Sequence, residues 1–165
     1  MDDQQAMTAL VTPLGGPPPA IHWQWEPETD ILTGAYRRVR PGESSASLEL
    51  VSPEGAVIVL DLIEGEVCGL DVVIWPDVET RAGLQAPPPL SMGRVSLPMA
   101  REPREVDQEL AIEVDGLEET FHLVVGPRRL ATAVRVADHL LVEVDSANRL
   151  AGFWLTGVPP FPSEE

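Results

Sequence analysis

The chain has 165 residues, of which 27 are acidic and 11 are basic, and a formal net charge of −16 at pH 7. This charge argues against direct binding of nucleic acid, because phosphates would be repelled unless a local basic patch dominated. The single cysteine, Cys68, excludes an intramolecular disulfide and fits a reducing compartment. The N-terminus has no basic region followed by an apolar run, and no apolar run approaches the roughly 20 residues of a membrane span. We therefore expect a cytoplasmic protein with no membrane partner.

The length is typical of one compact domain or of two closely packed halves. Composition divides the chain into five segments. They are a polar, then Gly- and Pro-rich flexible leader (1–19), a first β unit (20–75), a Pro-rich crossing or linker (76–105), a second β unit (106–157) and a tail (158–165).

Strand patterns begin at "IHWQW", where alternation places Ile21, Trp23 and Trp25 on one face. Further strands are predicted in the first half at 33–40, 46–51, 55–63 and 65–75. In the second half they are predicted at 108–116, 118–126, 130–136, 139–145 and 149–157. This spacing predicts a mainly β fold with little helix, in which two similar antiparallel sheet units pack together as a sandwich or barrel.

The segment "AVIVLDLIEGEVCGLDV" (56–72) is similar to "HLLVEVDSANRLAGFWL" (139–155), and both read as hairpins. A tight turn needs residues that tolerate positive φ, which glycine and asparagine do. Glycine inside a strand indicates a bulge or a close backbone approach. We expect three pairs of structural positions to correspond: Asp61 with Asp145, Gly65 with Asn148, and Gly69 with Gly152. The two aspartates are expected to fix the hairpin geometry.

These segments resemble a family of short bacterial proteins known only as a domain of unknown function. Its signature opens with an aromatic residue and acid-x-Glu-x-Asp-x-Leu, similar to Trp25 through Leu32. It closes with Asp-x-x-Gly-x-hydrophobic-x-Gly-hydrophobic-Glu-hydrophobic, similar to Asp61 through Val72 with one extra residue before the first glycine and Asp71 in place of Glu. The second copy keeps the aspartate, turn and glycine positions, but Trp154 replaces the acid. The resemblance covers about 21–75 and, more weakly, 118–156, and it implies a tandem copy of a small β-sheet fold and no established activity.

Catalytic and metal-binding patterns are not recognisable in the sequence. His22, His122 and His139 have no metal-ligand spacing, and Cys68 has no companion, so these histidines are expected at the surface. There is no serine–histidine arrangement, phosphate-binding glycine loop or dinucleotide fingerprint. We expect no catalytic residue, no metal and no cofactor.

Carboxylates gather at a predicted turn that contains Glu26, Glu28 and Asp30. Together with Asp71 they form a candidate site for a cation or small ligand, or an acid/base pair. The favoured interpretation is a solvated turn in which Asp30 caps backbone N–H groups.

Two further features bear on a protein partner. The acidic stretch 102–119, with Glu105, Asp107, Glu109 and Glu113, is either a solvated face or the docking face for a basic partner. Trp23 and Trp25 are expected as core anchors, and they become interface candidates if they are exposed. The arginine clusters 37–40 and 128–129 are interpreted as solvated strand ends.

The leading functional hypothesis is a non-enzymatic β-domain that acts through protein–protein interaction and regulates or neutralises a basic partner. The first alternative is a small-ligand- or cation-binding domain, or an enzyme, that uses the carboxylates of Glu26, Glu28, Asp30 or Asp71. The second is a structural subunit of a larger assembly, a homo-oligomer whose open sheet edges pair between chains.

Overall fold

In the computed structural model, residues 7–98 and 104–162 are described, and every regular element within them is a β-strand. The strands up to the end of the Pro-rich crossing are β1 (Leu10–Pro13), β2 (Gln24–Glu26), β3 (Ile31–Ala35), β4 (Ser45–Val51), β5 (Val57–Ile63), β6 (Glu66–Ile74), β7 (Val78–Thr80) and β8 (Ser91–Ser96). The later strands are β9 (Arg104–Asp107), β10 (Leu110–Val114), β11 (Phe121–Val125), β12 (Ala131–Ala137), β13 (Leu140–Asp145) and β14 (Leu150–Leu155). The predicted mainly β fold is confirmed. In the part of the chain described, no helix is long and apolar enough to cross a membrane.

The strands form one large curled sheet in the order β7-β10-β11-β14-β13-β12-β8-β6-β5-β4-β9, with β1 paired to β8 and β2 and β3 branching from β6. The predicted antiparallel pairing is not confirmed for the sheet as a whole, because β4·β9, β7·β10 and β8·β12 are parallel. One strand of each parallel pair belongs to the crossing: β7 and β8 lie within it, and β9 begins at its end. A connection of that length can return a strand in the parallel direction, which a short hairpin turn cannot.

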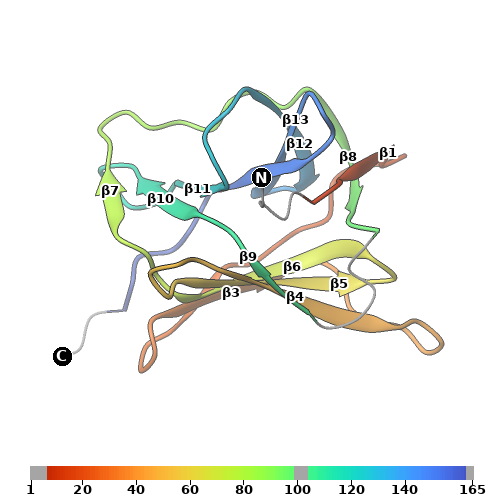
Figure 1. The fold of residues 1–165 in the computed structure, drawn as a ribbon, viewed down its shortest axis with the longest axis horizontal. Coiled ribbons are helices and arrows are strands. Elements are labelled where there is room, and N and C mark those ends of the chain that lie inside the picture. Colours follow the sequence, from red (N-terminus) through yellow and green to blue (C-terminus); the bar gives the residue numbers. More distant parts are fainter. Residues whose placement is uncertain (1–6, 99–103, 163–165) are drawn as a thin grey trace.

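The curl brings two arms of the sheet face to face. Figure 1 shows β3, β4, β5 and β6 in the lower arm and β10 to β13 in the upper arm. β6 and β8 join the arms through a single register pair, Glu66↔Ser96. Along each arm the strands follow the same order, β2-β3-β6-β5-β4 in one and β10-β11-β14-β13-β12 in the other.

One apolar core fills the space between the arms. In β5 the burial alternates, so that Ile58, Leu60 and Leu62 face the core while their neighbours face outward. β14 is buried along its whole length. On its second face, Leu84 and Ala86 of the crossing pack on the cluster that contains Trp154. Each fully buried aliphatic side chain contributes about 1.5–3 kcal/mol relative to leaving it in water, so the core is the main source of stability.

The predicted flexible leader is ordered over its described part. β1 pairs with β8 in antiparallel register, and Met7 and Ala9 are each only 1% exposed. The backbone N–H of Ala9 donates to the carbonyl of Asn148 over 2.8 Å. The crossing 76–105 is likewise more than a linker, since it supplies β7, β8 and the start of β9. Residues 1–6, 99–103 and 163–165 of the leader, crossing and tail lie outside the described residues.

The glycines and turns of the two similar hairpins have the expected backbone geometry. Gly65 and Asn148 have φ of 83° and 59°. A register shift adjoins Gly69 in one hairpin and Gly152 in the other. A Cβ on Gly152 would lie 2.4 Å from the carbonyl oxygen of Leu123, so the strand backbones approach too closely for a side chain there.

The predicted correspondence of the two aspartates is wrong. Asp61 lies inside β5 opposite Gly69, and the residue opposite Gly152 is Glu143 rather than Asp145. The reason is the longer second turn, which moves Asp145 to the strand end and out of register with Asp61.

Candidate functional site

Four aromatic rings surround a pocket of about 330 Å³ at one end of the two arms. Trp25 and Trp75 stack with their ring centroids 5.6 Å apart, and Phe121 and Phe161 meet Trp25 edge-on at 6.5 and 5.1 Å. Asp30, Glu118, Val78 and Val114 complete the lining. We call this cavity the aromatic pocket.

The indole N–H groups of the two tryptophans are already used within the protein. Trp75 donates its Nε1–H to the carbonyl of Asp30 over 2.7 Å, and Trp25 donates to the carbonyl of Pro159 over 2.8 Å. These bonds fix both ring orientations and tie the tail 158–162 to β2. Because the two indole rings stack on each other, only the parts of the rings that line the pocket are available as its contact surface.

The two acidic residues of the pocket come from two similar hairpin turns. Asp30 ends the β2–β3 turn and Glu118 lies in the β10–β11 turn, with φ of 61° and 60°. Aromatic faces carry negative potential, and carboxylates add negative charge beside them. A cavity of this size with an apolar wall and a few polar groups is typical of a ligand site. The arrangement is suited to an organic cation such as a guanidinium or ammonium group.

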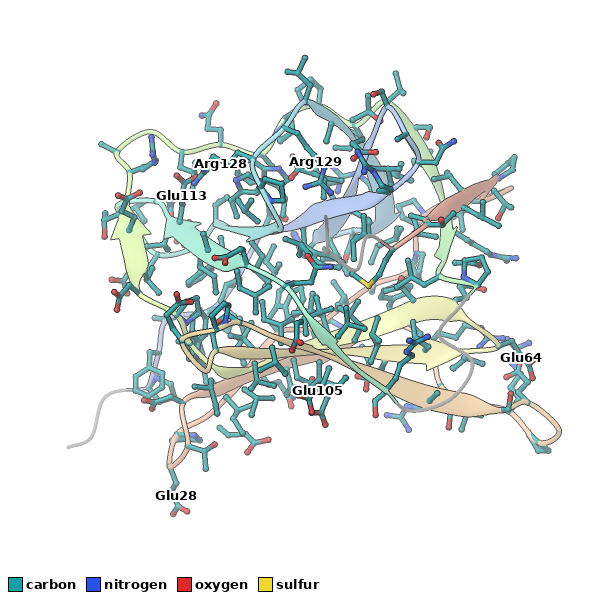
Figure 2. The ribbon with its side chains drawn as sticks, viewed as in Figure 1. Glu28, Glu64, Glu105, Glu113, Arg128 and Arg129 are labelled. Carbon is teal, nitrogen blue, oxygen red and sulfur yellow. The ribbon has the colours of Figure 1, made fainter. Side chains whose placement is uncertain are left out.

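The structure brings only some of the predicted site residues together. Trp25 and Asp30 line the aromatic pocket, whereas Glu26, the last residue of β2, and Glu28, in the turn that follows, are absent from its lining. Figure 2 shows Glu28 at the tip of that turn, directed away from the sheet. Trp23 is buried at 5% exposure and packs in the core, so it is excluded as a contact for a partner.

Asp71 lies inside β6, and its carboxylate accepts a hydrogen bond from the Thr33 hydroxyl. Burial, and to a smaller extent the charge of Glu26, raise the pKa of Asp71, so Asp71 and Glu26 influence each other as the sequence suggested. Burial also raises the pKa of Asp61 to about 6, with a further contribution from the charge of Asp71. Burial also raises the pKa of the Cys68 thiol to about 12, so it is not a thiolate nucleophile at neutral pH.

The acidic stretch divides between surface and interior. Glu105, Asp107 and Glu109 are exposed, and Figure 2 shows Glu105 on β9. Glu113 is only 4% exposed. Its carboxylate pairs with the guanidinium groups of Arg81 and Arg128, the latter over 2.8 Å. Glu113 is therefore the buried member of an ion-pair network whose arginines are exposed, and its carboxylate is occupied within the protein.

His122 belongs to the same network and is not a surface histidine, contrary to the prediction. Its Nε2 lies 2.8 Å from Glu143 Oε1, its Nδ1 lies 3.5 Å from Glu113 Oε1, and its ring stacks on Trp154 at 3.9 Å. Trp154 donates its Nε1–H to the second oxygen of Glu143 over 2.9 Å. Burial raises the pKa of Glu143, but the bonds and charge of His122 outweigh it, and the net pKa is lowered.

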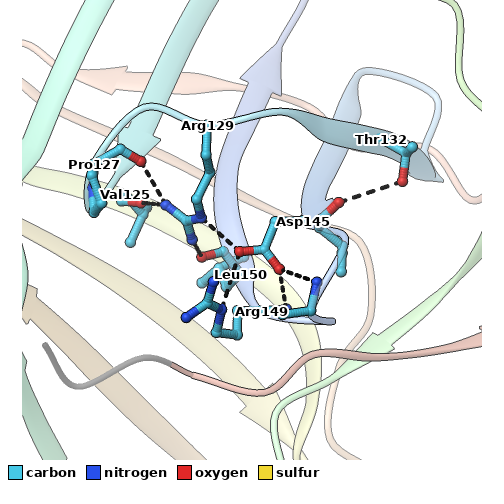
Figure 3. A network of polar contacts seen from close by, with 9 residues as sticks. Val125, Pro127, Arg129, Thr132, Asp145, Arg149 and Leu150 are labelled. Carbon is cyan, nitrogen blue, oxygen red and sulfur yellow. Dashed lines mark hydrogen bonds and ion pairs between the residues drawn. The ribbon is translucent and has the colours of Figure 1, made fainter.

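Asp145 holds the turn of the second hairpin, as Figure 3 shows. Its Oδ1 accepts from the backbone N–H groups of Ala147 and Arg149, each over 2.9 Å, and its Oδ2 accepts from Arg129 Nε over 2.7 Å. Arg129 also donates to three backbone carbonyls, so it is a structural residue and not a solvated strand end. Burial raises the pKa of Asp145, and these partners outweigh it and lower the net pKa.

The aromatic pocket was not visible in the sequence, because its lining comes from four separate parts of the chain. Phe121 and Phe161 carry no motif, and only their aromatic character could have drawn attention to them. Within residues 7–98 and 104–162, no three His, Cys, Asp or Glu side chains are grouped so that they could hold a metal ion. No protein-family model matches the chain, and no curated protein matches it.

Proposed function

We propose that this protein is a non-enzymatic, cytoplasmic binding module that holds a cationic side chain of a protein partner in the aromatic pocket, and regulates or neutralises that basic partner. The observation that supports it is the combination of four aromatic rings with Asp30 and Glu118 around one cavity of about 330 Å³. A cation over an aromatic face contributes about 0.5–2 kcal/mol, more when it is desolvated.

The charge of the whole chain favours the same class of partner. A net charge of −16 attracts a basic protein over long range and speeds its encounter, which weakens as salt is added. Glu26 at the end of β2 and Glu28 on the following turn are exposed beside the pocket, where they add to the local negative potential. Trp25 and Trp75 are the type of residue that dominates binding energy at protein interfaces.

We infer further that the two arms are tandem copies of one small β unit packed as a sandwich, in line with the family resemblance of 21–75 and 118–156. The shared strand order and the register shifts beside Gly69 and Gly152 support this reading. On that basis the aromatic pocket lies between equivalent turns of the two copies, and a single copy would carry only half of it.

The alternative of an assembly built by edge-strand pairing receives less support. The sheet path ends at β7 and β9, which are three and four residues long, and each carries exposed acidic side chains. Short, charged edges are features by which proteins prevent pairing between chains.

The proposal is tested by titrating the protein with a short arginine-rich peptide and following tryptophan fluorescence. A peptide of the same length with citrulline in place of arginine is the matched control ligand, since it removes the charge and keeps the shape. We expect the arginine peptide alone to bind.

Two pocket variants and one control identify the site. Phe161→Ala and Asp30→Asn should each weaken binding by roughly 2- to 30-fold, the range that corresponds to about 0.5–2 kcal/mol. Asparagine tolerates the positive φ of position 30, so the fold is retained. Glu54→Gln, which removes one exposed charge on the β4–β5 turn, should leave the affinity within about twofold after correction for salt. Equal effects of all three variants would show non-specific charge attraction and refute the site.

A further inference from the structure

A second pocket, of about 310 Å³, lies at the seam where β8 diverges from β6. The two strands pair only at Glu66↔Ser96, so beyond that point the sheet opens beside Gly93 and Arg94. The leader covers the opening with Leu14, Pro17 and Pro19, and the segment after β3 contributes Tyr36, Arg37 and Arg40. We call this cavity the seam pocket.

The leader wall of the seam pocket is held in place at both ends. β1 pairs with β8 from Leu10↔Ser96 to Pro13↔Gly93. Beyond the wall, the backbone N–H of Asp138 donates to the carbonyl of Pro19 over 2.8 Å, and the N–H of Ile21 donates to the Asp138 carboxylate over 2.9 Å. The cavity is therefore formed by the fold itself and not by a loose surface segment.

The charge of the seam pocket is opposite to that of the protein. Three arginines line it, against Glu66 as its single acidic lining residue, in a chain with a net charge of −16. Glu66 lies 3.9 Å from Arg94 Nε, a weak ion-pair distance, and the Arg94 side chain is 55% exposed. Within the described residues the guanidinium of Arg40 has no hydrogen-bond or ion-pair partner in the protein. Since Arg37 pairs with Glu43 and Arg94 lies near Glu66, Arg40 supplies the positive charge in excess at the seam pocket.

Arg37 provides an independent observation. Its Nη2 pairs with the carboxylate of Glu43, while its Nη1 is buried and has no hydrogen-bond partner among the described residues. A buried donor of a charged group without a partner costs free energy, and native structures retain few such atoms without a ligand, ion or water to satisfy them. Because Nη1 has no accessible surface, an anion in the seam pocket would satisfy this donor only after a rotation of the Arg37 side chain.

We propose that the seam pocket binds a small organic phosphate. Guanidinium groups present planar pairs of N–H donors that match phosphate oxygens, and several of them around one cavity match a group with multiple negative charges. Leu14, Pro17 and Pro19 offer an apolar wall for the organic part of the ligand. The cavity volume limits that part to a small molecule. This site is separate from the aromatic pocket and does not depend on the function proposed for it.

The test is isothermal titration of the full chain with phenyl phosphate, with inorganic phosphate and phenol as comparison ligands, at constant ionic strength. We expect phenyl phosphate to bind more tightly than inorganic phosphate and phenol not to bind. Absence of binding by phenyl phosphate up to about 5 mM would overturn the proposal.

Matched arginine variants locate the binding. Arg40→Ala and Arg94→Ala should each weaken phenyl phosphate binding by about tenfold, the loss expected for one charge-assisted contact. Arg38→Ala removes the same charge from an exposed neighbouring position outside the seam pocket and should change affinity by less than about twofold. Arg94→Gln serves as a second variant if Arg94→Ala lowers the unfolding midpoint. If Arg38→Ala and Arg40→Ala weakened binding equally, the loss of affinity would come from the change in net charge and not from a contact in the seam pocket, and the site would be refuted.

Discussion

Replacing Asp61 by asparagine is expected to stabilise the protein at neutral pH. Asp61 lies on the outward face of β5 opposite Gly69, and no hydrogen bond to its carboxylate occurs within the described residues. Burial, and next the charge of Asp71, raise its pKa from an ordinary 3.8 to about 6. Asparagine has nearly the same shape and no charge, so the substitution removes the unfavourable ionisation and leaves the packing intact.

The magnitude follows from the pKa difference between the folded and unfolded states. The change from 3.8 to about 6 corresponds to about 3 kcal/mol, at about 1.4 kcal/mol for each tenfold change in the acid constant. Partial solvent access screens the charge, so we expect about 1–2 kcal/mol. Because the folded-state pKa is raised, the penalty is absent below pH 3.8, develops as the pH rises toward 6, and is complete above it.

The assay is urea unfolding of the wild-type protein and Asp61→Asn at pH 4 and pH 7.5. The variant should exceed the wild type by about 1–2 kcal/mol at pH 7.5 and match it within about 0.5 kcal/mol at pH 4. Asp77→Asn, at an exposed position, should be neutral at both values. A lower stability of Asp61→Asn at pH 7.5, or a gain that is the same at both pH values, would refute the reasoning.

Three other substitutions test the remaining structural claims. Asp145→Asn should destabilise by about 3 kcal/mol at pH 7, because it removes the counter-charge of Arg129 and Arg149. The loss should shrink as urea unfolding is repeated at lower pH, since the lowered pKa of Asp145 stabilises the folded state only while the carboxylate is ionised. Gly152→Ala should cost about 1–3 kcal/mol in urea unfolding, because its Cβ would meet a neighbouring carbonyl oxygen at 2.4 Å, whereas Gly116→Ala meets nothing within 4 Å and should be tolerated. Leu84→Ala should cost about 1–2 kcal/mol and shift tryptophan emission to longer wavelength, because it uncovers Trp154; Leu130→Ala, at a residue 93% exposed, should change neither stability nor emission.

The local sequence pattern was sufficient to predict the core strands and the two hairpin turns. Alternation predicted β5, whose buried and outward residues follow each other along the strand. The positive φ of Gly65 and Asn148 follows from residue type, since few other residues adopt it without strain. The similarity of 56–72 to 139–155 anticipated the common bulge beside Gly69 and Gly152.

The parts that sequence reasoning missed depend on what a segment packs against. The leader and the Pro-rich crossing have loop composition, yet they contribute β1, β7 and β8 because other strands offer them free edges. Nothing local distinguishes Glu113, which is buried in an ion-pair network, from Glu109, which is exposed. Whether a side chain is buried depends on what covers its face of the sheet. For the outer face, the covering segment is the crossing, which is distant in sequence.

The strand periodicity, the turn residues and the strong negative charge of this protein depend on residue type and nearest neighbours, so they can be read from the sequence. Where opposite charges and aromatic rings converge depends instead on contacts between distant segments. The aromatic pocket joins Trp25 with Phe121 and Phe161, and the seam pocket joins Arg37 with Arg94, across long stretches of chain. Such sites arise where the curl of the sheet closes on itself, and that closure is set by the packing of the whole core.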